Sequence, residues 1–127
     1  MDLEAATIVL GFFYILVMRK NIERTYHTIV ESPHLYDIQY FAYRFDDVDN
    51  SKSYIDLHLK KGDEVCELRF WEPRDLEIEK GFPYATGGMY IEDVSKHGLE
   101  SLNVYVGDFE ASNGSITFWA KSVEKTN

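Results

Sequence analysis

Apolar residues in the first part of the chain follow helical spacing. Residues 5–18 (AATIVLGFFYILVM) carry no charge, and this run suits either a helix or a buried strand. After it, apolar residues recur at steps of three and four with charged residues between them: Ile22, Tyr26, Ile29 and Val30. This spacing predicts an amphipathic helix whose apolar face packs on the rest of the domain. Pro33 ends it, because its ring disfavours helical geometry in the preceding residue.

From Tyr36 onward the apolar period changes to two, which predicts β-strands. The first predicted strand changes parity near Tyr43, as a strand with a bulge does. The next two alternate cleanly and flank Gly62, which predicts a hairpin. Further strands are predicted at 76–78, 89–91, 102–106 and 116–120, the last reached through Asn113-Gly114.

The resulting fold class is α+β and mainly antiparallel β. An N-terminal apolar and amphipathic helix within residues 1–31 precedes an antiparallel β body at 36–125, with about seven short strands in a sandwich or curled sheet. The chain has 127 residues, of which 45% are hydrophobic. This is enough for one core, so residues 1–127 are predicted to form a single domain.

Charge narrows the class of partner. Thirteen Lys and Arg stand against 22 Asp and Glu, giving a formal net charge of −9. The excess is concentrated after residue 45, where the net charge is −8. Such a field opposes binding to nucleic acid and favours a basic protein partner.

Compartment and membrane contact follow from the N-terminal residues and the single cysteine. Asp2 and Glu4 precede the uncharged run, where a secretory signal needs basic residues. The run's 14 residues would span about 21 Å as a helix, short of the roughly 30 Å hydrocarbon core. With only Cys66, no internal disulfide can form. A cytoplasmic protein is therefore predicted. The alternative is an inner-membrane-associated accessory protein anchored by residues 5–18, which basic residues follow.

No motif for catalysis or metal binding emerges. Asp47 and Asp49 begin an alternation of oxygen ligands that resembles a calcium loop, but Lys52 replaces the required glycine and His58 the final carboxylate. The four histidines show no metal spacing. We therefore predict no cofactor and no metal. Cys66 shares parity with the apolar residues of its strand and is predicted to be buried.

Aromatic residues give the candidate partner-binding positions. Trp71 and Trp119 lie on the parity opposite to Phe70 and Phe118, which predicts that both indoles leave the main core face. Aromatic side chains beside acids are effective interface anchors. The competing interpretation is a second buried face. The predicted partner-binding residues are Trp71, Trp119, Tyr84, Tyr90, Asp47, Asp49, Glu92, Asp93, Asp108 and Glu110.

The segments ELRFWEPRDLEIE, GGMYIEDVSKHGLESLNVYVGDFE and GSITFWAKSVEK resemble the small, acidic, β-rich immunity proteins of bacterial polymorphic toxin systems. The resemblance covers residues 36–125 and carries over no site residue. It implies a cytoplasmic inhibitor that occludes a toxin.

The leading hypothesis is accordingly a non-enzymatic acidic module that binds a basic protein partner. Besides membrane association, the remaining alternative is an enzyme whose pocket is built from dispersed carboxylates and histidines.

Overall fold

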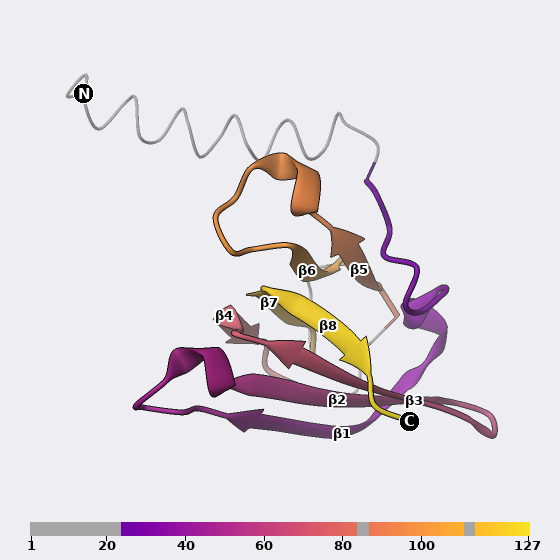
Figure 1. Cartoon of the computed structure of the whole chain (residues 1–127). Coiled ribbons are helices and arrows are strands. Elements are labelled where there is room, and N and C mark those ends of the chain that lie inside the picture. The colour runs from indigo at the N-terminus through magenta and orange to yellow at the C-terminus, as the bar shows by residue number, and fades with distance from the viewer. Residues whose placement is uncertain (1–23, 84–86, 111–113) are drawn as a thin grey trace, which may run out of the picture.

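The computed structural model describes residues 24–83, 87–110 and 114–127, which form two antiparallel sheets of four strands each (Figure 1). The strands are β1 (Asp37–Arg44), β2 (Tyr54–Lys61), β3 (Glu64–Trp71), β4 (Arg74–Ile78), β5 (Met89–Asp93), β6 (Val104–Asp108), β7 (Ile116–Ala120) and β8 (Ser122–Lys125). Three short 3₁₀ turns accompany them: η1 (Pro33–Leu35), η2 (Asn50–Lys52) and η3 (Ser95–His97).

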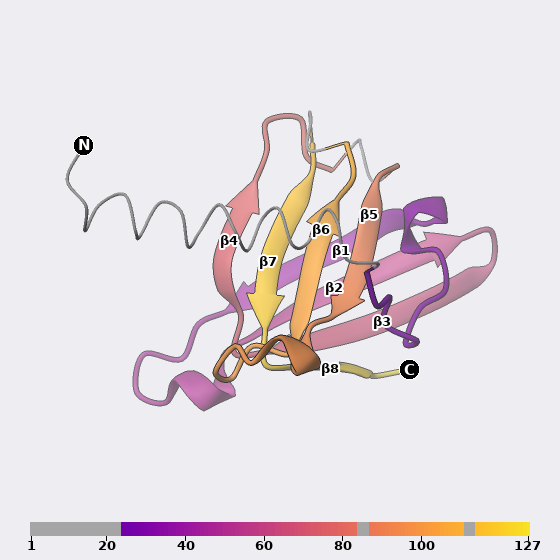
Figure 2. The ribbon, with the colours of Figure 1, turned by 90° about the horizontal axis from the view of Figure 1, so that it is seen from above.

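The strand order is β1-β2-β3-β8 in the first sheet and β4-β7-β6-β5 in the second. The sheets lie face to face, and the strands of one cross those of the other (Figure 2). Strands β7 and β8 are consecutive in sequence but belong to different sheets. The chain changes sheet at Lys121, whose backbone N–H donates to the carbonyl of Trp71 at 2.9 Å.

One hydrophobic core fills the space between the sheets. Every second residue of β2 and β3 points into it from the first sheet, and every second residue of β6 and β7 from the second. Phe70 and Phe118 meet there with ring centroids 4.9 Å apart and perpendicular planes. This edge-to-face geometry is favourable for aromatic pairs and joins the two layers. The fully buried apolar side chains include Ile55, Leu57, Leu59, Leu68, Phe70, Val106 and Phe118.

The predicted N-terminal helix is wrong where the structure describes it. Residues 24–31 contain no α-helix, and Tyr26 forms an antiparallel bridge with Glu92 of β5. The His27 N–H donates to the Ile91 carbonyl, and the Asp93 N–H donates to the Thr25 carbonyl, both at 2.8 Å. An edge strand carries unpaired backbone groups, and this segment satisfies some of those of β5. The described chain is therefore mostly antiparallel β with no α-helix.

The residues predicted to share one face of that helix do not share a face in the structure. Val30 is buried in the core and Ile29 packs against it, whereas Tyr26 is 54% exposed. An extended segment followed by a turn sends residues three or four apart in different directions, unlike a helix. Ile22 and the uncharged run 5–18 lie outside the described residues.

The strand predictions agree better with the structure. The hairpin of β2 and β3 turns at Gly62, whose φ of 60° favours glycine. The predicted bulge exists, but the register of β1 shifts between Ile38 and Tyr40 rather than near Tyr43. Strand β8 was not predicted as a separate strand. Its sequence, SVEK, has one apolar residue and hence no alternation to detect.

Cys66 is buried on β3, with 5% of its surface exposed, as its parity predicts. Burial raises the pKa of its thiol, because the thiolate is poorly solvated there. Thiol reagents should therefore modify Cys66 slowly in the native protein and rapidly after denaturation. Mass spectrometry of time-resolved alkylation measures both rates. Equal rates in the two states would show that the thiol is accessible without unfolding.

Candidate functional site

The outer face of the second sheet carries a continuous series of aromatic contacts. The Phe109 and Tyr90 rings lie 4.5 Å apart, Tyr90 and Tyr105 6.1 Å, and Tyr105 and Trp119 4.5 Å. Tyr26 adds edge contacts at 6.4 Å from Tyr90 and 6.3 Å from Phe109. Tyr90, Tyr105 and Trp119 lie on β5, β6 and β7. Phe109 directly follows β6, and Tyr26 lies in the segment bridged to β5. The series therefore depends on strand pairing.

The absence of a side chain at Gly107 leaves room for the Tyr90 ring. Gly107 lies opposite Tyr90 in the pairing of β5 and β6. A Cβ atom at Gly107 would collide with the Tyr90 ring and approach Tyr105 Cε2 to 2.6 Å. Glycine within a strand commonly marks such a close approach, and an aromatic ring can cover the backbone that it leaves bare.

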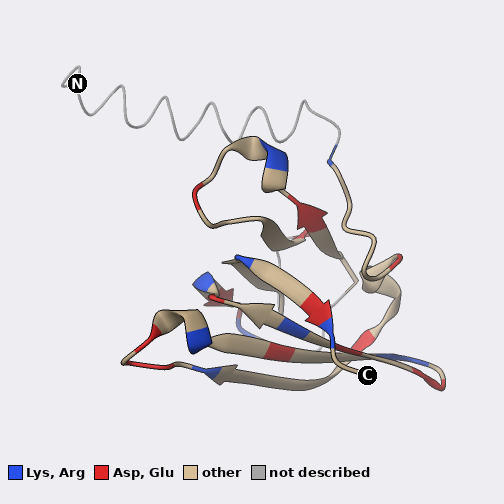
Figure 3. Cartoon of the chain, viewed as in Figure 1, with Lys and Arg blue, Asp and Glu red and all other residues tan. Residues whose placement is uncertain are grey.

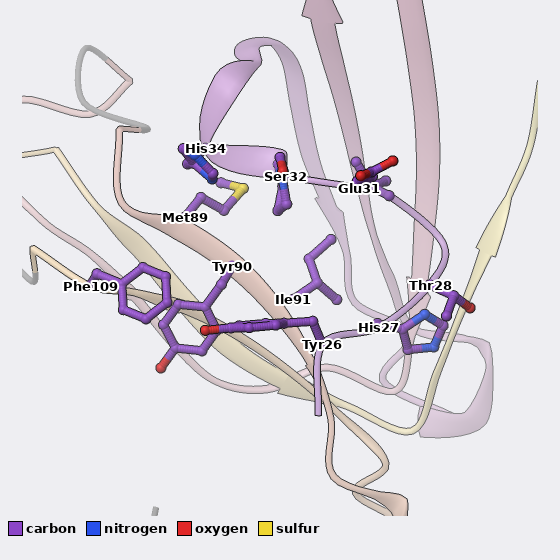
Figure 4. A pocket seen from close by; sticks show the side chains of 12 residues that line it. Tyr26, His27, Thr28, Glu31, Ser32, His34, Met89, Tyr90, Ile91 and Phe109 are labelled. Carbon is purple, nitrogen blue, oxygen red and sulfur yellow. The ribbon is translucent and has the colours of Figure 1, made fainter. Parts of the chain in front are cut away.

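A groove of about 480 Å³ lies between β5 and residues 26–34, beside these rings (Figure 4). Figure 4 shows Tyr26, Tyr90 and Phe109 together at one side, while His27 and Thr28 lie away from Phe109. Ligand sites typically have volumes of about 300–1,000 Å³ with mainly apolar walls. The lining residues are Tyr26, His27, Thr28, Val30, Glu31, Ser32, Pro33, His34, Met89, Tyr90, Ile91 and Phe109.

The groove is suited to a positively charged group. Its described lining contains no Lys or Arg but includes the exposed carboxylate residue Glu31. The Arg24 guanidinium carbon lies 4.9 Å from the Tyr90 ring centroid and 5.2 Å from that of Phe109. Both distances are in the range of cation–π interactions. The aromatic wall thus already accommodates a guanidinium.

Asp93, at the end of β5, adds a stable negative charge near this region. Its carboxylate accepts hydrogen bonds from the Ser95 hydroxyl at 2.6 Å and the Ser95 N–H at 3.0 Å. These bonds lower the pKa of Asp93, and His27 lowers it further. Acidic residues also occur on both sheets and in the connecting loops (Figure 3).

Six of the predicted partner-binding residues lie on or next to β5, β6 and β7: Tyr90, Glu92, Asp93, Asp108, Glu110 and Trp119. Their accessibility differs. Glu110 is exposed, and Asp93 and Asp108 are half-buried. Tyr90 is only 7% exposed and Glu92 only 1%. Glu92 therefore has almost no surface with which to contact a partner, and Tyr90 can contribute only as part of the groove wall.

The other predicted residues lie elsewhere. Trp71 is half-buried on the outer face of the first sheet, where its ring lies 5.4 Å from that of Tyr54. Asp47 and Asp49 are in the loop between β1 and β2. Asp49 accepts hydrogen bonds from the N–H and hydroxyl of Ser51, which lower its pKa. Tyr84 is outside the described residues. The predicted set therefore does not form one site.

Tyr26, Phe109 and Glu31 are candidate site residues that the sequence pattern does not predict. The spacing of Tyr26 predicts the buried face of a helix, which does not form in residues 24–31. Phe109 carried a usable signal, because it stands between Asp108 and Glu110 directly after a strand. Glu31 carried none, since its position depends on the turn before Pro33.

Residues 24–83, 87–110 and 114–127 contain no group of three or more His, Cys, Asp or Glu side chains that could hold a metal ion. The same residues contain no helix of the length and apolarity needed to cross a membrane. Comparison of the chain with protein-family models, curated proteins and solved structures gives no match.

Gly107→Ala should destabilise the protein by about 1–3 kcal/mol, the usual range for forced overpacking. The reason is the collision with the Tyr90 ring. Urea unfolding measures the change. Gly87→Ala is the matched control, since its Cβ would meet nothing closer than 4.0 Å. In a Tyr90→Ala background the Gly107→Ala cost should fall, and an unchanged cost there would contradict this cause.

Asp93→Asn should destabilise the native state at pH 7. The folded-state pKa of Asp93 is lowered from an ordinary value of 3.8. Its stabilising contribution is therefore complete above that value and is lost as pH falls through the lower folded-state pKa. Urea unfolding at a series of pH values should show the wild-type and Asp93→Asn stabilities converging in acid. A constant difference from pH 7 to pH 2 would contradict the assignment.

Proposed function

We propose that this protein is a non-enzymatic acidic module that binds a basic protein partner, with the groove beside β5 receiving a basic side chain. The observation that carries the proposal is the pair of exposed aromatic residues at the groove. Tyr26 is 54% and Phe109 is 53% exposed, and both contact Tyr90. Aromatic anchors contribute large buried area at small entropic cost when a partner covers them.

Charge supports a basic partner over a neutral or acidic one. The chain carries a net charge of −9, and such a field accelerates encounter with a basic surface. The position of Arg24 over Tyr90 and Phe109 provides an internal example of the proposed contact. A partner's arginine or lysine beside Tyr26 would gain the same type of ring contact and the nearby carboxylate of Glu31.

The specific form of the proposal is an immunity protein that occludes a basic toxin. Its support is the resemblance of residues 36–125 and the acidic surface. An inhibitor of this kind needs a complementary surface and no catalytic group. The proposal therefore requires only binding at the groove.

The two alternatives have weaker support. Membrane association depends on residues 5–18, which the structure does not describe. An enzyme would use His27, His34 or Glu31 in the groove. His27 Nδ1, however, accepts the Ile29 N–H at 3.1 Å and holds the local turn. A general base must instead be within reach of a substrate proton.

Affinity capture from the native cell extract tests the proposal at about 0.05 M and 0.5 M salt. The wild-type chain should retain a basic protein at low salt and lose most of it at high salt. Phe109→Ser and Tyr26→Ser should capture it much less, because truncating an interface anchor typically costs about 2 kcal/mol or more. Ile78→Ser is the matched control, since Ile78 is 47% exposed on β4, at the opposite edge of the sheet.

Binding kinetics with the captured partner then separate the contribution of charge from that of the aromatic anchors. Salt should mainly slow association, whereas Tyr26→Ala and Phe109→Ala should mainly speed dissociation. Trp71→Ala and Trp119→Ala in the same assay test the anchors predicted from sequence parity. Equal capture by the wild type and both groove variants, with normal dissociation rates, would contradict a role for the groove.

A further inference from the structure

Strand β1 forms one border of the first sheet, and no other described strand pairs with its outer side (Figure 2). The backbone groups along that side can therefore pair with an added strand. The edge of β5 differs, because residues 25–27 of the same chain hydrogen bond to it.

Strand β1 and its C-terminal end carry several exposed hydrophobic side chains. Tyr40 is 49%, Tyr43 38% and Phe45 66% exposed. Proteins usually protect open edges with charges, prolines or bulges. In β1 the only charged residues are Asp37 and Arg44, which cancel, and the register shift lies before Tyr40. The stretch from Tyr40 to Tyr43 is thus a regular edge without charge in an otherwise acidic chain.

The pairing with β2 assigns each β1 side chain to a face. Phe41 and Tyr43 lie opposite the core residues Leu57 and Ile55, so they belong to the inner face. The alternate residues Tyr40, Ala42 and Arg44 belong to the outer face. Directly opposed residues in an antiparallel pair share a face. A symmetric pairing of two β1 strands must therefore centre on a residue.

We propose that a second copy of this chain pairs with β1 in antiparallel register, with the two-fold axis at Ala42. Tyr40 then faces Arg44 of the second copy on the outer face, which suits a cation–π contact. Phe41 faces Tyr43 of the second copy on the inner face, and aromatic pairs stabilise opposed strands. The smallest side chain of the stretch stands at the axis.

The neighbouring registers fit less well. Centring on Tyr43 places Arg44 opposite Ala42 and Tyr40 opposite Asp46, which removes the cation–π pair. Centring on Phe41 places Ala42 opposite Tyr40 and directs Arg44 towards the bulged end of the strand. Only the Ala42 register gives both the arginine and the inner aromatic residues complementary partners.

This inference does not rest on the proposed function, because the groove lies in the other sheet. The two also differ in their salt dependence. Two copies with a net charge of −9 each repel one another, so screening should favour self-association. The same screening should weaken binding to a basic partner.

Register-specific cross-linking tests the proposal in a Cys66→Ala background. At the axis, opposed Cβ atoms lie about 4.5–5.5 Å apart, so Ala42→Cys should form a disulfide-linked dimer after modest adjustment under mild oxidation. Two copies of Tyr40→Cys would be offset by four residues, about 13 Å, and should cross-link poorly. Adding Arg44→Cys to Tyr40→Cys should restore cross-linking. Ser122→Cys, on the other edge strand, controls for random collision.

Sedimentation of the wild-type chain provides the second readout. A concentration-dependent dimer is expected, and Ala42→Asp should shift it to monomer, because two carboxylates would meet at the axis. Circular dichroism and urea unfolding show whether that variant remains folded. A monomer at all accessible concentrations would overturn the proposal. Equal cross-linking of Ala42→Cys and Tyr40→Cys would overturn it as well, whatever the oligomeric state.

Discussion

Burial of one face of each sheet against the other is the interaction on which the remaining structure depends. Phe70 and Phe118 meet edge to face at its centre. Because strand side chains alternate, placing these residues inside obliges Trp71 and Trp119 to point outward. The outward indoles then pack on their own sheets, Trp71 beside Tyr54 and Trp119 beside Tyr105. The two tryptophans are thus components of the outer faces.

The edges of the two sheets differ in how their backbone groups are satisfied. Residues 25–27 hydrogen bond to β5, and the following turn towards Pro33 encloses the groove. The same segment that satisfies an edge therefore also forms one wall of the groove. Strand β1 has no such cover among the described residues. The edge at β5 thus presents a concave aromatic surface. The edge at β1 presents backbone groups to which a second strand can hydrogen bond.

Negative charge acts on these surfaces from a distance. Several carboxylates are held by local hydrogen bonds that lower their pKa, as for Asp49 and Asp93. These groups lose their charge at lower pH than an ordinary aspartate does, so they contribute to the acidic field of the folded surface. Such a field favours basic partners and opposes association of like chains. Self-association must therefore depend on short-range contacts along a neutral strand.

The sequence by itself determined the strands in which apolar residues alternate, the β2–β3 hairpin and the burial of Cys66. Those features are properties of a strand and its own turn, so local periodicity is sufficient. The sequence did not determine the path of residues 24–31. Apolar positions three and four residues apart also occur in an extended segment that is followed by a turn. Pairing with β5, more than 60 residues away, decided that path. The polar strand β8, the burial of Glu92 and the groove were likewise decided by tertiary structure, since each depends on neighbours that are distant in sequence.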